Sequence, residues 1–216
     1  MRYRTGNIWI VCVIGLAVGC VVSPEADKDR GLYLEREDLE EYGIELTGET
    51  AERSSRRVVF VDGSYVLEYL LQGINDDGEK ISIDIAARYE RTAAQAMAEF
   101  MSMREQWLAV NGGEDGPIQL AENFYHFGDE SFFAFIVSPA GPLGNLFVCR
   151  LGCQVYSIVI SGAFCDDPCI WDEMVGPKLR FWSIYQPIPG RDNPSAPREK
   201  NAPPKQQPPL PGTVLV

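Results

Sequence analysis

The chain has 216 residues and a formal net charge of −12, with 31 acidic residues against 19 lysines and arginines. A chain this acidic is a poor nucleic-acid binder, because contacts to phosphates need patches of lysine and arginine. The one basic cluster, Arg53, Arg56 and Arg57, is small and follows an acidic stretch. We therefore expect no nucleic-acid partner.

The N-terminus has the pattern of a secretory signal. Arg2 and Arg4 precede an unbroken apolar run from Ile8 to Val18, and small residues follow it. A basic flank, an apolar run of this kind and a small-residue end are typical of a segment that is removed on export. The run is shorter than the roughly 20 residues that span a bilayer, although an uncleaved anchor stays an alternative. We expect a signal peptide over residues 1–19.

The residues "LAVGC", which end at Cys20, resemble the signal of bacterial lipoproteins. The resemblance implies that Cys20 receives a diacylglycerol and that its new amino group is acylated, for example with palmitate. Ala17 stands where that family most often has leucine. Because Val21 and not aspartate follows the cysteine, the resemblance implies a lipid-anchored protein of the bacterial cell envelope, in the outer membrane of a Gram-negative cell. A secretory signal with an incidental cysteine is the alternative.

Two further segments are expected to lie outside the folded domain. In residues 20–52, acidic residues outnumber basic ones by eleven to three, so we predict a charged spacer that extends by self-repulsion. Residues 189–216 are rich in proline, which predicts a disordered tail with polyproline conformation. The stretch "KQQPPLP" in this tail also fits a ligand for SH3-type grooves, which are mostly cytoplasmic.

Residues 53–188 between these segments are expected to form one α+β domain. Two apolar runs flank "NDDG" at 75–78, and isoleucines alternate with polar residues in the second run. This pattern predicts a hairpin with one buried face. Apolar residues at helical spacing then follow Thr92, which forms a capping box with Gln95, and "NGG" ends the run. These signals predict an amphipathic helix.

The second half of the domain is expected to add four strands and a closing helix. Residues 119–127 and 131–138 predict two strands, and a loop follows at 139–145. The runs on either side of "RLG" predict a second hairpin. Asp167 and Pro168 fit the first positions of a helix, in which Pro177 would cause a kink or end the first half.

The expected order is therefore β-β-α-β-β-β-β-α. It predicts an antiparallel sheet with two helices, most simply packed on one face, in a layered sandwich. The layout is similar to PsbP-like domains, which occur in some exported bacterial lipoproteins. The similarity concerns topology alone and implies no particular ligand.

Four cysteines lie within "CRLGCQVYSIVISGAFCDDPC". The stretch 154–161 is rich in β-branched residues and predicts a strand, which would hold the two pairs about 25 Å apart. Disulfide partners need Cα atoms within about 7 Å, and a zinc site needs all its sulfurs near one ion. We therefore predict two structural disulfides, Cys149–Cys153 across the hairpin and Cys165–Cys169 at the helix start. A four-cysteine metal site and a redox pair are the alternatives.

The signals for catalysis are weak. His126 is the only histidine, and no nucleophile elbow or phosphate-binding loop accompanies it, so we expect no cofactor. Alternation in the expected strand would place Tyr125 and Phe127 on the face opposite His126. Aromatic residues here are expected mainly in the core, and the alternative is a contact surface formed by Tyr125, His126, Phe127, Asp129 and Glu130.

Taken together, these features predict a non-catalytic envelope lipoprotein that is attached to membrane lipid through Cys20. Its domain would bind an unidentified envelope protein or small ligand, or support an assembly. The alternative function is an envelope enzyme or a metal-dependent factor that uses His126 and nearby acids.

Overall fold

The computed structural model describes residues 21–23, 27–111 and 117–185. The chain divides into two units, Met1–Gln186 and Pro187–Val216, and the described residues all belong to the first. The expected signal peptide, Cys20 and the proline-rich tail of residues 189–216 lie outside the described residues. The predictions made for them therefore stay predictions.

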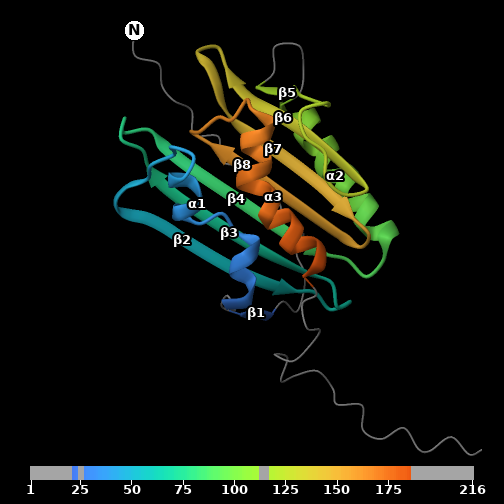
Figure 1. Cartoon of the computed structure of the whole chain (residues 1–216). Helices are drawn as coiled ribbons and strands as arrows, with labels where there is room; N and C mark the ends of the chain where they lie inside the picture. The colour runs from blue at the N-terminus through green and yellow to red at the C-terminus, as the bar shows by residue number, and fades with distance from the viewer. Residues whose placement is uncertain (1–20, 24–26, 112–116, 186–216) are drawn as a thin grey trace, which may run out of the picture. The chain divides into compact units, whose positions relative to one another are not determined.

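A single antiparallel sheet dominates the described part, with the strand order β1-β2-β3-β4-β8-β7-β6-β5 (Figure 1). The strands are β1 (Val21–Ser23), β2 (Thr47–Val59), β3 (Tyr65–Ile74), β4 (Lys80–Tyr89), β5 (Ile118–Leu120), β6 (Glu130–Ser138), β7 (Gly141–Leu151) and β8 (Gln154–Ser161). The helical elements are the 3-10 helix η1 (Asp27–Leu32) and the helices α1 (Arg36–Glu40), α2 (Ala93–Asn111) and α3 (Pro168–Ile184). The expected α+β class, an antiparallel sheet with packed helices, is confirmed.

The two long helices lie on opposite faces of the sheet. In β6, the ring centroid of Phe132 lies 6.0 Å from that of Phe100 in α2. The next residue, Phe133, has its centroid 4.9 Å from that of Trp171 in α3. Successive side chains of a strand point to opposite faces, so the expectation that both helices share one face is wrong. Figure 1 shows α3 in front of the sheet with η1 and α1, and α2 behind it.

This arrangement explains two kinds of sequence pattern among the strands. The middle of β7 and of β8 is buried at every position, because α3 covers one face and α2 the other. Strands covered on both faces are apolar on both sides, and the buried stretches of β7 and β8 are mainly apolar, with Asn145, Ser157 and Arg150 as the buried polar residues. In β4 only alternate residues are fully buried, as expected where a helix covers one face.

The local signals for turns and caps are confirmed. In the β3–β4 turn the amide of Asn75 donates to the carbonyl of Glu79 over 2.9 Å. At the start of α2 the Thr92 hydroxyl accepts a bond of 3.1 Å from the amide of Gln95. At the start of α3 the Asp167 carboxylate accepts one of 2.7 Å from the amide of Cys169. The α3 helix then continues through Pro177.

The acidic segment belongs to the folded domain, and the prediction of a spacer over residues 20–52 is wrong for its described part. Between Asp29 and Leu46, five large side chains are at most 1 % exposed: Leu32, Tyr33, Leu34, Leu39 and Leu46. The Tyr33 ring stacks on that of Tyr69 at 4.4 Å. A Cβ on Gly31 would lie 2.8 Å from the Phe181 ring of α3. The acids of this segment mostly face solvent while its apolar residues cover the sheet, so the domain begins well before residue 53.

Two expected element boundaries are also wrong. The loop expected over residues 139–145 is a short turn, and β7 begins at Gly141. The strand expected over 119–127 ends at Leu120. After it the amide of Phe124 donates to the carbonyl of Ala121 over 3.0 Å, which turns the chain back toward the sheet.

Candidate functional site

Tyr125 and Phe127 follow the end of β5, and both are partly buried against the core. The Tyr125 ring lies 5.4 Å from that of Phe147, and its hydroxyl donates to the Asp172 carboxylate of α3 over 2.7 Å. The Phe127 ring lies 6.4 Å from that of Trp182. Burial, and then the bond to Asp172, raises the pKa of Tyr125 above the ordinary range of a phenol. These contacts give both residues a role in packing, and the interpretation of them as a contact surface stays a prediction.

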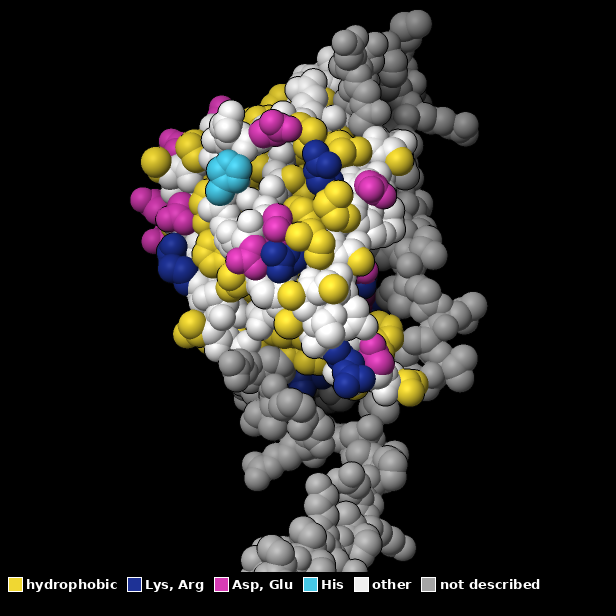
Figure 2. Space-filling view, turned by 90° about the vertical axis from the view of Figure 1, so that its right-hand side faces the viewer, with side chains coloured by type: hydrophobic (Ala, Val, Ile, Leu, Met, Phe, Trp, Pro, Cys, Tyr) yellow, Lys and Arg dark blue, Asp and Glu magenta, His cyan; other side chains and the backbone are white. Residues whose placement is uncertain are grey.

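His126, in contrast, is exposed. Its Nδ1 atom lies 3.3 Å from the Ser131 hydroxyl oxygen, and this is a neutral hydrogen-bonding partner. Figure 2 shows the one histidine at the surface, on a face where acidic and basic side chains are interleaved with apolar ones. A base that is oriented for catalysis would need an acidic or metal partner in addition to a hydroxyl.

Asp129 and Glu130 both bind Arg150 of β7. The Arg150 Nη2 atom lies 3.1 Å from the Asp129 carboxylate, and its Nε atom donates to the Glu130 carboxylate. Arg150 is only 8 % exposed, and its Nη1 atom also donates to the carbonyl of Gly152 over 2.7 Å. The bond to Glu130 and the neighbouring charges of both acids raise the pKa of Arg150. The two acids thus hold the start of β6 to the end of β7.

Backbone contacts also hold residues 128–130 to the end of β7. The amide of Asp129 donates to the carbonyl of Arg150 over 2.7 Å, and the Asp129 carboxylate accepts a bond of 2.9 Å from the amide of Gly152. Gly128 has φ +81°, and a Cβ there would lie 2.3 Å from the Arg150 carbonyl oxygen. Since a side chain at position 128 would clash with backbone, only glycine allows this approach. The structure therefore gives Asp129 and Glu130 a structural role.

The strand that was expected to separate the cysteine pairs is confirmed as β8, Gln154–Ser161. The register of the β7–β8 hairpin differs from the expected one, however. Cys149 pairs across the ladder with Tyr156, and Leu151 pairs with Gln154, so Cys153 lies in the turn. The expectation that Cys149 and Cys153 face one another is wrong, and this register argues against a bond between them.

The four thiols have different surroundings and are unbonded in the structure. Cys149 is buried and Cys153 is exposed, and burial raises the pKa of the Cys149 thiol well above its usual value. Cys165 and Cys169 flank the Asp167 cap of α3, where the Cys165 Sγ atom lies 3.3 Å from the Asp167 carbonyl oxygen. A disulfide between Cys165 and Cys169 stays a prediction.

A buried polar cluster that the sequence did not indicate lies near the start of the chain. The Asp29 carboxylate is 1 % exposed, and it binds Arg57 of β2 at 2.9 Å. The hydroxyl of Tyr185, just after α3, donates to the same carboxylate. Burial, and then this bond, raises the pKa of Tyr185. The cluster joins the N-terminal segment, the sheet and the end of α3.

Two more tyrosines extend this cluster. The rings of Tyr65 and Tyr89 stack at 4.5 Å, and the Tyr185 ring lies 6.2 Å from that of Tyr89. The Arg57 guanidinium lies 5.8 Å from the centre of the Tyr65 ring, within the range of a cation–π interaction. The hydroxyls of Tyr65 and Tyr89 are buried, and neither has a hydrogen-bonding partner among the described residues. No spacing in the sequence brings these five residues together, so sequence reasoning could not find them.

The described residues hold no cluster of three or more histidine, cysteine, aspartate or glutamate side chains that could bind a metal ion. The helices among them are also too short or too polar to cross a bilayer. Comparisons with known protein families, with curated protein sequences and with solved structures found no match.

Proposed function

We propose that this chain is a non-catalytic lipoprotein of the bacterial cell envelope. A lipid on Cys20 attaches it to a membrane, in the outer membrane if the cell is Gram-negative. Its α+β domain binds an envelope protein or a small ligand there, or supports an assembly. The signal-like residues 1–19 and the "LAVGC" sequence support this proposal.

The observation that carries the proposal is the place of Val21 in the sheet. This residue, the first after Cys20, already pairs with Val59 of β2. Six residues after β1, the buried pair of Asp29 and Arg57 fixes the chain to the sheet. A lipid on Cys20 would therefore hold the domain directly at the membrane surface, without the spacer that the acidic composition suggested.

The described surroundings of His126 do not support the alternative of acid–base catalysis. Its described partner is the Ser131 hydroxyl, and the two nearest acids in the sequence, Asp129 and Glu130, bind Arg150 instead. Acid–base catalysis needs a positioned group with a tuned pKa and a partner that orients it. This arrangement gives no support to an enzyme that uses His126 with these acids.

The test is the variant Cys20→Ala, expressed with its signal. We expect the wild-type chain in the membrane fraction with an acylated Cys20 in its mass spectrum, and the variant in the soluble envelope fraction. Cys153→Ala is the matched control, because Cys153 is exposed and should not affect attachment. Full membrane retention of Cys20→Ala would reject the lipid anchor, and a soluble wild-type chain would indicate an ordinary secretory signal.

A further inference from the structure

Two aliphatic side chains stand out at the surface. Val61 is 83 % exposed and Ile184 is 78 % exposed, whereas the other exposed large hydrophobic side chains of the described residues reach at most 45 %. Single exposed aliphatic residues are common on proteins. Val61 and Ile184 differ from isolated cases because the tertiary structure brings both to the same end of the sheet.

The buried polar cluster links the two residues. Ile184 is the last residue of α3, and the adjacent Tyr185 packs its ring 6.2 Å from that of Tyr89. Tyr89 stacks on Tyr65 at 4.5 Å, and Tyr65 begins β3 directly after the turn that carries Val61. The end of α3 and the β2–β3 turn therefore meet at one corner. We name the corner formed by Val61, Tyr65 and Ile184 the aliphatic corner.

Strand β1, the first described element, begins at this same corner. Strand β1 runs antiparallel to β2, with Val21 opposite Val59 and Ser23 opposite Arg57. The start of β1 thus lies beside the end of β2, and the β2–β3 turn follows that end. The turn is tight, since the amide of Phe60 donates to the carbonyl of Ser64 over 2.8 Å. A lipid on Cys20, the residue before Val21, would begin next to the aliphatic corner.

We propose that the aliphatic corner rests on the bilayer and inserts Val61 and Ile184 among the lipid headgroups. This inference depends on the proposed attachment through Cys20 and adds the orientation of the domain to it. The transfer of aliphatic side chains out of water is favourable, so Val61 and Ile184 are the side chains of this corner that would contact lipid. The Tyr65 hydroxyl is buried inside the domain and takes no part in the contact. The strands then rise from the membrane with the β3–β4 turn at the far end.

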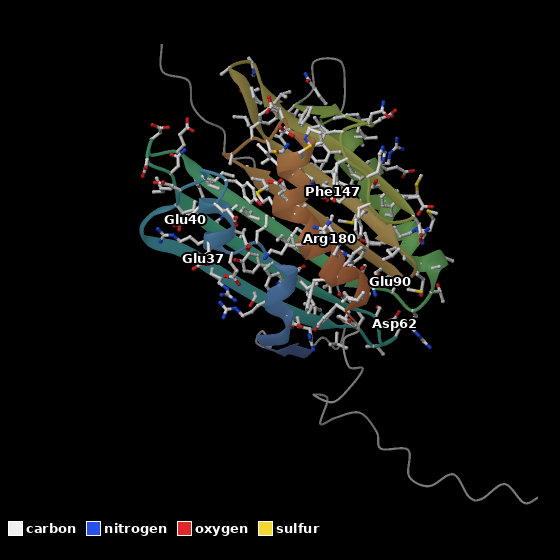
Figure 3. All side chains as sticks on the ribbon, viewed as in Figure 1. Glu37, Glu40, Asp62, Glu90, Phe147 and Arg180 are labelled. Atoms are coloured by element: carbon white, nitrogen blue, oxygen red, sulfur yellow. The ribbon has the colours of Figure 1, made fainter. Side chains whose placement is uncertain are left out.

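The distribution of charge supports this orientation. The β3–β4 turn, which carries exposed Asp76, Asp77 and Glu79, lies at the other end of the ten-residue strand β3, about 30 Å away at the usual rise per residue. Figure 3 shows Glu37 and Glu40 of α1 on the side of the domain away from the end that carries Asp62 and Glu90. Anionic headgroups repel acids, so the most acidic parts point away from the membrane.

Asp62 limits how deeply the corner enters the bilayer. Its carboxylate accepts bonds from the Ser64 hydroxyl over 2.6 Å and from the Ser64 amide over 2.9 Å. These bonds lower the pKa of Asp62, so the group is ionised at neutral pH and has to stay hydrated. Val61, the neighbouring residue, can thus reach the headgroup layer while the turn stays outside the hydrocarbon core.

Photo-cross-linking to lipid tests the inference on the full, lipidated chain. The reactive residue p-benzoylphenylalanine replaces Val61, Ile184 or, as the matched control, Ile74, which is 45 % exposed at the far end of β3. Each protein is bound to vesicles of phosphatidylethanolamine and phosphatidylglycerol, irradiated and analysed by mass. We expect lipid adducts from positions 61 and 184 and only background from position 74.

The outcomes separate this inference from the proposed anchor. Adducts that are absent at position 61, or equally abundant at position 74, would overturn the orientation even if the protein floats with the vesicles. The flotation of the Cys20→Ala chain tests the anchor independently, because it does not depend on cross-linking. Circular dichroism of each variant shows that the fold is intact, as expected for substitutions at exposed positions.

Discussion

The Nη2 atom of Arg57 lies 3.0 Å and 2.9 Å from the two carboxylate oxygens of Asp29, across 28 residues of sequence. The pair is almost fully buried, with side chains that are 11 % and 1 % exposed, and the Tyr185 hydroxyl donates to the same carboxylate. A charge removed from water must be compensated by partners. This contact therefore determines where the N-terminal segment attaches to the sheet.

Replacing one member of this pair should destabilise the domain strongly. We expect Asp29→Ala to lower the free energy of unfolding by about 3–5 kcal/mol, because it leaves the Arg57 charge buried without its partner. Urea unfolding followed by tryptophan fluorescence measures the change. The control is Glu40→Ala, which breaks an exposed pair with Arg36 and should cost at most about 0.5 kcal/mol. Equal losses for the two variants would contradict a special role for Asp29.

Two buried tyrosines offer a matched comparison of hydroxyl groups. The Tyr156 hydroxyl donates to the carbonyl of Leu32 over 2.8 Å, whereas the buried Tyr89 hydroxyl has no partner in the part of the chain that the structure describes. We expect Tyr156→Phe to cost about 1–3 kcal/mol of unfolding free energy, since a buried carbonyl loses its donor. Tyr89→Phe should leave the unfolding free energy unchanged or increase it, because it removes a buried hydroxyl that makes no hydrogen bond to a described residue. Denaturant melts of the two variants check this, and a larger loss for Tyr89→Phe would show that the hydroxyl has an unseen partner.

Asp84 of β4 should make stability depend on pH. Burial, and then the nearby charge of Glu68, raises the pKa of Asp84 in the folded protein. A raised folded-state pKa means that the ionised carboxylate destabilises the fold at every pH above its unfolded value of about 3.9. Asp84→Asn should thus stabilise the domain at pH 7, and its advantage should disappear as the pH falls below about 3.9.

The measurement for Asp84 is the urea midpoint of both proteins between pH 3 and pH 8. Asp77→Asn is the control, because Asp77 is exposed in the β3–β4 turn and its substitution should change the midpoint little. An advantage of Asp84→Asn that is the same at all pH values would show that the carboxyl is not desolvated in the folded protein.

The cysteines should differ sharply in reactivity. Cys149 is buried and opposite Tyr156, and burial raises its pKa, so few thiolates form. We expect iodoacetamide to modify Cys153 in the native protein and Cys149 only after unfolding.

Mass spectrometry of non-reduced peptides tests the predicted Cys165–Cys169 disulfide. A peptide that joins Cys149 to Cys153 would contradict the hairpin register, and one that joins Cys149 to Cys165 would contradict the separation by β8.

The sequence determined the elements whose signals are local. The "NDDG" turn, the Thr92 cap of α2, the Asp167 cap of α3 and strand β8 all occur as expected. Each depends on residues that are close in the chain, and hydrogen bonds to nearby backbone groups or β-branched side chains decide them. The mainly apolar stretches 146–149 in β7 and 155–160 in β8 also indicate strands that are covered on both faces.

Only the tertiary structure decided the role of the acidic segment and of the aromatic residues before β6. The acidic composition predicts a solvated spacer, but composition does not specify which side chains face solvent, and the leucines of this segment are buried in the core. Likewise Tyr125 and Phe127 turn inward because Phe147 and Trp182 lie beneath them. Partners such as Arg57 for Asp29 and Arg150 for Asp129 are distant in sequence, and the energy of a buried charge depends on such partners, which no local pattern specifies.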